Sequence, residues 1–164
     1  MSRPLRVTAV CSGNICRSPI AEYVLRDAVE RAGLGHAIVV DSAGVGAWHV
    51  GEGADHRSVR VLAARGYDAS GHRVQQITRA WFEHDDAPNL LLAMDSSHDG
   101  ALRSMAPDAD VWMMRSFDPT LAGRADADLD VPDPYYGGID GFADVLQMIE
   151  RATPGVLAYL KNRL

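Results

Sequence analysis

The sequence predicts an α/β fold: an open, twisted sheet of four parallel strands, flanked by helices on both faces, in a single domain. Two observations predict it. Four short apolar runs are nearly continuous in hydrophobicity, as strands buried on both faces are. Helical spacing of apolar residues separates or follows these runs, and strands that alternate with helices favour parallel pairing through right-handed crossovers. The four predicted strands are Leu5–Val10, Ala37–Val40, Leu90–Met94 and Val111–Met114.

The predicted helices follow apolar stripes that recur every three or four residues. The first stripe ends before Gly33 and the second at Gly66, and glycine commonly terminates helices. Beyond the third stripe, Pro154 predicts a kink or a restart of the C-terminal helix. The stripes lie within Ala21–Val29, Val59–Ala63 and Phe142–Ile149.

Composition narrows the classes of protein to consider. A chain of 164 residues without internal repeats or a long linker predicts one domain, residues 1–164. A net charge of −6 argues against a nucleic-acid partner, which needs a basic surface. No apolar run approaches the roughly 20 residues that cross a bilayer, so no membrane partner is expected.

The segment Met1–Leu5 lacks the apolar core of a secretory signal, and the chain has only two cysteines, which lie close together. This usage fits a reducing compartment rather than a disulfide scaffold. We expect a cytoplasmic protein and a monomer, with export by a route that needs no cleaved signal left open.

The most informative segment is Cys11–Ser18, directly after the first predicted strand. A loop this short between a strand and a helix curls, so that its backbone N–H groups point inward and form a nest for an anion. Gly13 and Asn14 tolerate left-handed backbone conformations, and Arg17 offers a planar fork to two phosphoryl oxygens. The pattern predicts a phosphate-binding loop after the first strand.

Cys11 is the candidate nucleophile of this loop. Inward N–H groups, a helix N-terminus and an arginine favour the thiolate, which is the reactive form. The hydroxyl of Ser18 can donate to that thiolate, and it can also cap the helix that Pro19 opens. The alternative is a cysteine that only packs as a small hydrophobe. A packing role does not explain why glycine, asparagine, arginine and Ser-Pro all follow the cysteine at these positions.

The run Val10–Pro19 matches without a gap the signature V-C-x-G-N-x-C-R-[ST]-P, and on it the chain resembles the low-molecular-weight protein tyrosine phosphatases, most closely their bacterial branch. Three further segments extend the resemblance over essentially the whole chain: Asp41–Gly44 with Trp48–Gly51, Ser70–Arg73, and the general-acid loop Asp133–Tyr136.

The resemblance implies hydrolysis of phosphotyrosine in proteins, and of small aryl phosphates, through a phosphocysteine intermediate. It implies no cofactor and no metal, and inorganic phosphate or vanadate as competitive ligands. Cys11 is the implied nucleophile, Arg17 a phosphate binder and Asp133 the general acid and base. The remaining implied substrate-binding residues are Ser12, Gly13, Asn14, Ile15, Cys16, Ser18, Trp48, Tyr135 and Tyr136, and the supporting ones, which hydrogen-bond Asn14, are Ser42 and His72.

Several residues have two interpretations. Asp95 either braces the loop or caps the following helix. Cys16 either traps an oxidised Cys11 as a disulfide or only packs beneath the loop. The acidic stretch Ser116–Pro134 suggests a metal site, but such loops are more often solvated and this one has no histidine, so we expect it to carry Asp133.

Other functions fit less well. A phosphoarginine phosphatase typically has threonine where this chain has Ile15, and an arsenate reductase needs two further cysteines. A non-catalytic phosphate-binding module is expected to lose Cys11 or Asp133, and the chain lacks the glycine-rich motifs of nucleotide-binding domains. It departs from the family pattern at Ser12 and His98, neither of which is expected to affect the chemistry.

Overall fold

The computed structural model describes residues 3–164, so the first two residues of the segment examined for a secretory signal lie outside it. Four strands form one sheet in the order β2-β1-β3-β4, and all neighbouring pairs are parallel. The predicted four-stranded parallel sheet is confirmed. The strands are β1 (Leu5–Cys11), β2 (Ile38–Gly44), β3 (Leu90–Ala93) and β4 (Val111–Met113).

Strand β2 is longer than predicted because Asp41–Gly44 continues the pairing with Thr8–Cys11, residue for residue. Its polar residues interrupt the apolar run without interrupting the strand. Ser42 and Gly44 are thereby placed beside the end of β1, from which the Cys11 loop begins.

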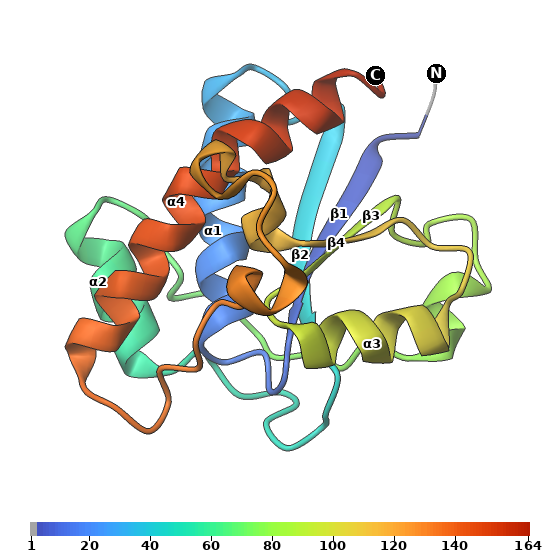
Figure 1. Ribbon diagram of the computed structural model, residues 1–164. Coiled ribbons are helices and arrows are strands. Elements are labelled where there is room, and N and C mark those ends of the chain that lie inside the picture. Colours follow the sequence, from blue (N-terminus) through green and yellow to red (C-terminus); the bar gives the residue numbers. More distant parts are fainter. Residues whose placement is uncertain (1–2) are drawn as a thin grey trace.

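Four helices cover the sheet. Figure 1 shows α1, α2 and α4 on one side of it and α3 on the other. Short 3-10 turns connect several elements, among them Met114–Phe117 and Asp126–Leu129. The helices are α1 (Arg17–Arg31), α2 (His56–Ala64), α3 (Ser96–Met105) and α4 (Ile139–Lys161).

Alternate residues of the strands face the two helical layers, as the twofold period of a strand requires. Val7 and Leu90 pack into one buried cluster with residues of α1 and α4. Val10 and Leu91 pack into a second cluster with Leu102 of α3. The strands are therefore buried on both faces, which explains their continuous hydrophobicity.

Helix α1 begins at Arg17, earlier than a cap at Ser18 allows, and no side chain caps it. The prediction of a Ser18 cap was wrong, because the hydroxyl of this buried residue lies at Cys11 instead. Helix α4 does not restart at Pro154. The neighbouring residues Ala152, Thr153 and Val156 are buried, and this packing holds the helix together across the proline.

Candidate active site

The loop between β1 and α1 is shaped by one left-handed residue and by contacts with β2. Asn14 has φ = 59°, as predicted, whereas Gly13 is outside the left-handed region and that part of the prediction was wrong. The glycine instead lets the loop lie close to His49, since a Cβ at Gly13 would be 3.2 Å from the His49 ring. A Cβ on Gly44 would lie 2.8 Å from the carbonyl oxygen of Ser12, so the end of β2 directly supports the loop.

A cavity of about 570 Å³ opens above the loop. It brings together side chains from the loop, from the segment after β2 and from the segment before α4. Most of the predicted site residues line it, and His49 joins them without having been predicted. The lining residues are Cys11, Ser12, Gly13, Ile15, Cys16, Arg17, Trp48, His49, Asp133, Tyr135 and Tyr136.

Asn14 and Ser18 lie beneath the cavity and are fully buried. Asn14 Nδ2 donates to Ser18 Oγ at 2.8 Å and to Ser42 Oγ at 2.9 Å, so both amide protons are used. Ser18 Oγ is also 2.9 Å from Cys11 Sγ. Because the serine oxygen accepts from Asn14, its own proton can be donated to the sulfur, which lies nearer than the other acceptor, the Ala43 carbonyl at 3.4 Å. Ser18 is thus arranged to stabilise a Cys11 thiolate.

Asn14 is held on its other atoms too. Its Oδ1 accepts from the backbone N–H of Gln75 at 3.1 Å, and its carbonyl oxygen lies 2.9 Å from His72 Nε2. Ser42 Oγ donates to Glu22 Oε1 at 2.6 Å. The structure therefore places both predicted supporting residues, Ser42 and His72, on Asn14.

Sequence reasoning missed Glu22, a buried carboxylate that pairs with Arg26 at 2.6 Å and lies 3.6 Å from His72. A signal was present in the sequence. Glu22 precedes Leu25 and Val29 by three and seven residues, so it lies on the apolar stripe of α1. An acid on such a stripe is unusual and points to a buried polar partner.

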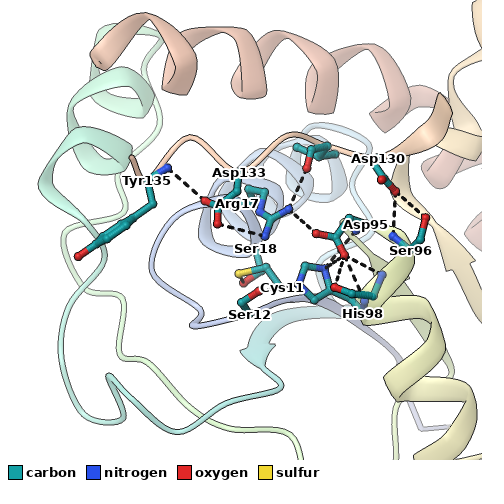
Figure 2. A network of polar contacts seen from close by, with 12 residues as sticks. Cys11, Ser12, Arg17, Ser18, Asp95, Ser96, His98, Asp130, Asp133 and Tyr135 are labelled. Atoms are coloured by element: carbon teal, nitrogen blue, oxygen red, sulfur yellow. Dashed lines mark hydrogen bonds and ion pairs between the residues drawn. The ribbon is translucent and has the colours of Figure 1, made fainter. Parts of the chain in front are cut away.

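The buried guanidinium of Arg17 spans the site (Figure 2). Its Nη1 donates to Asp95 Oδ2 and to the carbonyl of Val131, both at 2.8 Å, and its Nη2 lies 3.8 Å from Asp133 Oδ2. Asp95 also accepts from the backbone N–H groups of Ser97 and His98 at the start of α3. Both interpretations of Asp95 therefore hold, since the same carboxylate caps the helix and braces Arg17.

Asp95 is partly buried, and burial alone opposes its ionisation. The hydrogen bonds from Ser97 and Arg17 outweigh that effect and lower the pKa of Asp95 to about 2. The carboxylate therefore stays charged at physiological pH and holds Arg17 in place.

Asp133 is about half exposed, and its Oδ1 accepts from the backbone N–H of Tyr135 at 3.1 Å. Its segment is attached to α2 through Arg57, which donates to the carbonyls of Tyr135 at 3.0 Å and Gly137 at 2.8 Å. Asp55 holds Arg57 in turn, at 2.9 Å. Sequence reasoning missed Asp55 and Arg57, and nothing in their local sequence distinguishes them from an ordinary helix start.

Three aromatic side chains stand at the rim of the cavity. Trp48 is 73 % exposed, and its ring lies against Gly46, where any Cβ would overlap it. The rings of Tyr135 and Tyr136 are perpendicular, with centroids 5.0 Å apart, and Tyr136 is 92 % exposed. Such flat surfaces can contact an aryl group attached to a phosphate in the loop.

Cys16, the second cysteine, is buried beneath the loop with a free thiol. Burial, together with the negative charge of Asp55, raises the pKa of Cys16 to about 12. Its thiol is therefore protonated at neutral pH, unlike a reactive thiolate.

The acidic stretch before Asp133 is used for local hydrogen bonds. Asp130 Oδ1 accepts from the backbone and hydroxyl of Ser96 at 2.8 Å, and Asp118 accepts from the backbone of Thr120. Across residues 3–164, no three side chains of the His, Cys, Asp or Glu type are placed to hold a metal ion. Over the same range, no helix has both the length and the apolar character needed to cross a membrane.

Comparison with known proteins places this geometry in one family. Residues 6–164 match the family model described as "Low molecular weight phosphotyrosine protein phosphatase". The chain is 51 % identical to a low molecular weight protein-tyrosine-phosphatase of Streptomyces coelicolor, over 97 % of this chain and 95 % of that protein. It is 47 % identical to low molecular weight protein-tyrosine phosphatase A of Mycobacterium bovis, over 100 % and 96 %.

The fold matches as well. A crystal structure of a protein tyrosine phosphatase from Entamoeba histolytica, with Hepes in its active site, superposes with a TM-score of 0.85. It is 30 % identical to this chain, and the match covers 97 % of this chain and 98 % of the other.

Proposed function

Because the chain belongs to the low-molecular-weight protein tyrosine phosphatase family, we propose that it hydrolyses phosphotyrosine in proteins, and small aryl phosphates, through a phosphocysteine intermediate. One observation carries this proposal. The sulfur of Cys11, with the Ser18 hydroxyl 2.9 Å away, shares a cavity with Arg17 and Asp133, the groups that bind a phosphoryl group and transfer a proton.

In the first step Cys11 attacks phosphorus opposite the leaving group, so that an S–P bond forms as the P–O bond breaks. Arg17 and the inward N–H groups of the loop bind the three non-bridging oxygens and offset their charge. Asp133, in its protonated form, gives its proton to the departing phenolate. Because the pKa of a tyrosine hydroxyl is about 10, this transfer contributes about 10²–10⁴-fold to the rate.

In the second step water attacks the phosphocysteine, and the Asp133 carboxylate accepts its proton. The S–P bond breaks, and inorganic phosphate and the Cys11 thiolate are released. Since phosphate is the product and vanadate resembles the transition state, both are expected to compete with substrate.

The aromatic rim supports an aryl leaving group. Trp48, Tyr135 and Tyr136 line the cavity above the loop. Their flat surfaces can contact the phenyl ring of a phosphotyrosine whose phosphate lies in the loop, and phosphoserine has no ring to make that contact. Ile15 adds an apolar contact at the cavity wall. These features favour phosphotyrosine over phosphoserine and phosphoarginine.

A comparison of four substrates tests the proposal: peptides carrying phosphotyrosine, phosphoserine or phosphoarginine, and arsenate with a thiol reductant. We expect phosphotyrosine to be hydrolysed faster than phosphoserine by orders of magnitude, with no arsenate reduction. Cys11→Ser should abolish turnover while still binding phosphate or vanadate. A preference for phosphoarginine, or equal rates on phosphotyrosine and phosphoserine, would contradict the proposal.

The proposal extends to the setting of the enzyme. Cys11 can act as a nucleophile only where it stays reduced, and this requirement favours a cytoplasmic location. We expect a monomer, and size-exclusion chromatography with light scattering measures this directly.

A further inference from the structure

The two residues at which the chain departs from the family pattern touch each other. Ser12 follows the nucleophile, and His98 lies in the first turn of α3, 86 residues later. Ser12 Oγ lies 2.9 Å from His98 Nε2, and the imidazole is 1 % exposed (Figure 2). The contact therefore joins the phosphate-binding loop to the helix on the other side of the sheet.

The second nitrogen of the ring determines the direction of this hydrogen bond. The backbone N–H of Asp95 donates to His98 Nδ1 at 3.1 Å, which assigns a lone pair to Nδ1. Asp95 Oδ1 lies 3.2 Å from the same nitrogen, but that oxygen already accepts from Ser97 and from the backbone N–H of His98. Burial outweighs the charge of Asp95 and lowers the pKa of His98 to about 4, so the ring is neutral at physiological pH. A neutral imidazole with a lone pair on Nδ1 carries its proton on Nε2. His98 is therefore the donor, and the oxygen of Ser12 is the acceptor.

A hydroxyl that accepts from one side has its own proton free for another partner. Within residues 3–164, His98 is the one side-chain or backbone group that hydrogen-bonds Ser12 Oγ. Ser12 also lines the cavity, beside Cys11 and Arg17. The proton of the Ser12 hydroxyl is accordingly available to whatever anion occupies that cavity.

We propose that His98 is a positioning residue that directs the Ser12 hydroxyl into the cavity, where it donates a hydrogen bond to a phosphoryl oxygen of the substrate or of inorganic phosphate. The inference rests on the proposed function only in requiring a phosphate in this loop. Asp95 gives it a counterpart, since the same turn of α3 that holds Ser12 through His98 holds Arg17 through Asp95. The first turn of α3 thus aligns two anion donors at the two ends of one loop.

A purely structural contact would behave differently. If His98 and Ser12 only tied the loop to α3, removal of the hydroxyl would lower stability, because the buried Nε2–H would lose its acceptor. Phosphate affinity would then be unchanged in the folded protein. Affinity and stability measured on the same variants separate the two roles.

The experiment measures the dissociation constant of inorganic phosphate by calorimetry, with urea unfolding as a parallel readout. Ser12→Ala should weaken phosphate binding about 10- to 100-fold, the effect of one hydrogen bond to an anion. Ser12→Thr, which keeps the hydroxyl, should bind as the native protein does. His98→Phe, which fills the ring volume without a donor, should weaken binding by a similar factor.

The double variant tests whether His98 acts through Ser12. Ser12→Ala with His98→Phe should bind phosphate no more weakly than Ser12→Ala alone, because the two changes remove one effect. Ser96→Ala is the matched control: it loosens the start of α3 at its bond to Asp130 without touching Ser12, and should leave phosphate affinity unchanged.

Native-like phosphate affinity in Ser12→Ala would overturn the inference, as would full additivity in the double variant. If phosphate binding shows the expected pattern but phosphotyrosine is not hydrolysed, the proposed function fails and this inference stands. If phosphotyrosine is hydrolysed and Ser12→Ala binds phosphate normally, the inference alone fails. A native protein that binds no phosphate overturns both.

Discussion

Glu22 and Asn14 are joined through a single serine: Ser42 Oγ donates to Glu22 Oε1 at 2.6 Å and accepts from Asn14 Nδ2 at 2.9 Å. A buried carboxylate can only accept, so it forces Ser42 to donate toward it and to present a lone pair to Asn14. Asn14 also donates to Ser18 at 2.8 Å, so the Ser18 proton has two acceptors, Cys11 Sγ at 2.9 Å and the Ala43 carbonyl at 3.4 Å, of which the sulfur is the nearer. The amide nitrogen of Asn14 can only donate, so it fixes the direction of both of its own bonds, and Glu22 fixes the direction of the Ser42 proton.

The first prediction concerns Glu22→Gln. The amide can donate to Ser42, and the Ser42 proton then turns toward Asn14. Asn14 accepts it by flipping its side-chain amide, which gives up the bond from the Gln75 N–H to Oδ1. In the flipped state Ser18 donates to Asn14 Oδ1, and its donation to Cys11 is lost. We expect kcat on an aryl phosphate to fall about tenfold, the effect of one hydrogen bond to an anion, measured by steady-state kinetics with urea unfolding alongside. Asp27→Asn is the control, because it removes an acid of the same helix that pairs with exposed Arg31. Equal effects of the two changes would contradict the role of Glu22.

The second prediction concerns Asp133→Ala. Loss of the proton donor should lower the rate on phosphotyrosine by about 10²–10⁴-fold, because the phenolate must then leave unprotonated. The loss should be much smaller for an aryl phosphate whose leaving group is already a stable anion. A series of leaving groups of falling pKa measures this. Asp128→Asn, in the same acidic stretch, is the control. Equal losses across the series would reject Asp133 as the acid.

The third prediction concerns the aromatic rim. Trp48→Ala should raise KM for aryl phosphates several-fold while leaving the inhibition constant of inorganic phosphate nearly unchanged, because only the aryl group contacts the ring. Gly46→Ala should act similarly, since the added methyl displaces the Trp48 ring. Trp112→Ala removes another exposed tryptophan, packed near Phe117 and Tyr159, and should affect stability rather than KM. A parallel loss of phosphate affinity in Trp48→Ala would count against a rim that recognises the aryl group.

The fourth prediction concerns the two cysteines. Hydrogen peroxide oxidises a Cys11 thiolate to the sulfenic acid, and Cys16 can condense with it to a disulfide and water. A thiol reductant should then restore most activity in the native enzyme but not in Cys16→Ser. Because the pKa of Cys16 is about 12, few of its thiols are ionised at neutral pH, so protection should increase as the pH rises from 7 to 9. Equal recovery in both proteins would mean that Cys16 only packs.

The fifth prediction concerns pH and stability. The pKa of His98 falls from 6.5 to about 4 on folding, so between these values the unfolded chain binds more protons. The contribution of His98 is complete above pH 6.5 and is lost as the pH falls toward 4. The free energy of unfolding should drop by about 2–3 kcal/mol between pH 7 and 4.5 from this group. In His98→Phe the drop should be smaller by that amount, and an unchanged pH dependence would contradict the burial of a neutral ring.

The sequence alone predicted the four strands, their parallel pairing and the place of the Cys11 loop after the first strand. These features depend on residues that are neighbours in the sequence. Continuous apolar runs define the buried strands, and the eight residues Cys11–Ser18 contain the candidate nucleophile, the left-handed Asn14 and the arginine. Local conformational preference acts over such distances, so pattern and structure agree there. At Gly13 the prediction from local preference was wrong. The tertiary structure requires a glycine there because the loop packs closely against His49, and not because of a left-handed backbone angle.

Only the tertiary structure decided what holds the site in shape. Gln75, Arg57 and His98 reach the loop or the Asp133 segment from elements far apart in the chain, and Glu22 acts on the loop through Ser42. The contact of Ser12 with His98 spans 86 residues. No periodicity or spacing encodes such contacts, because they arise where α1, α2 and α3 pack against one sheet. The chemistry of a residue can be read from its neighbours in the chain. The direction of its hydrogen bonds depends on neighbours that only packing brings together.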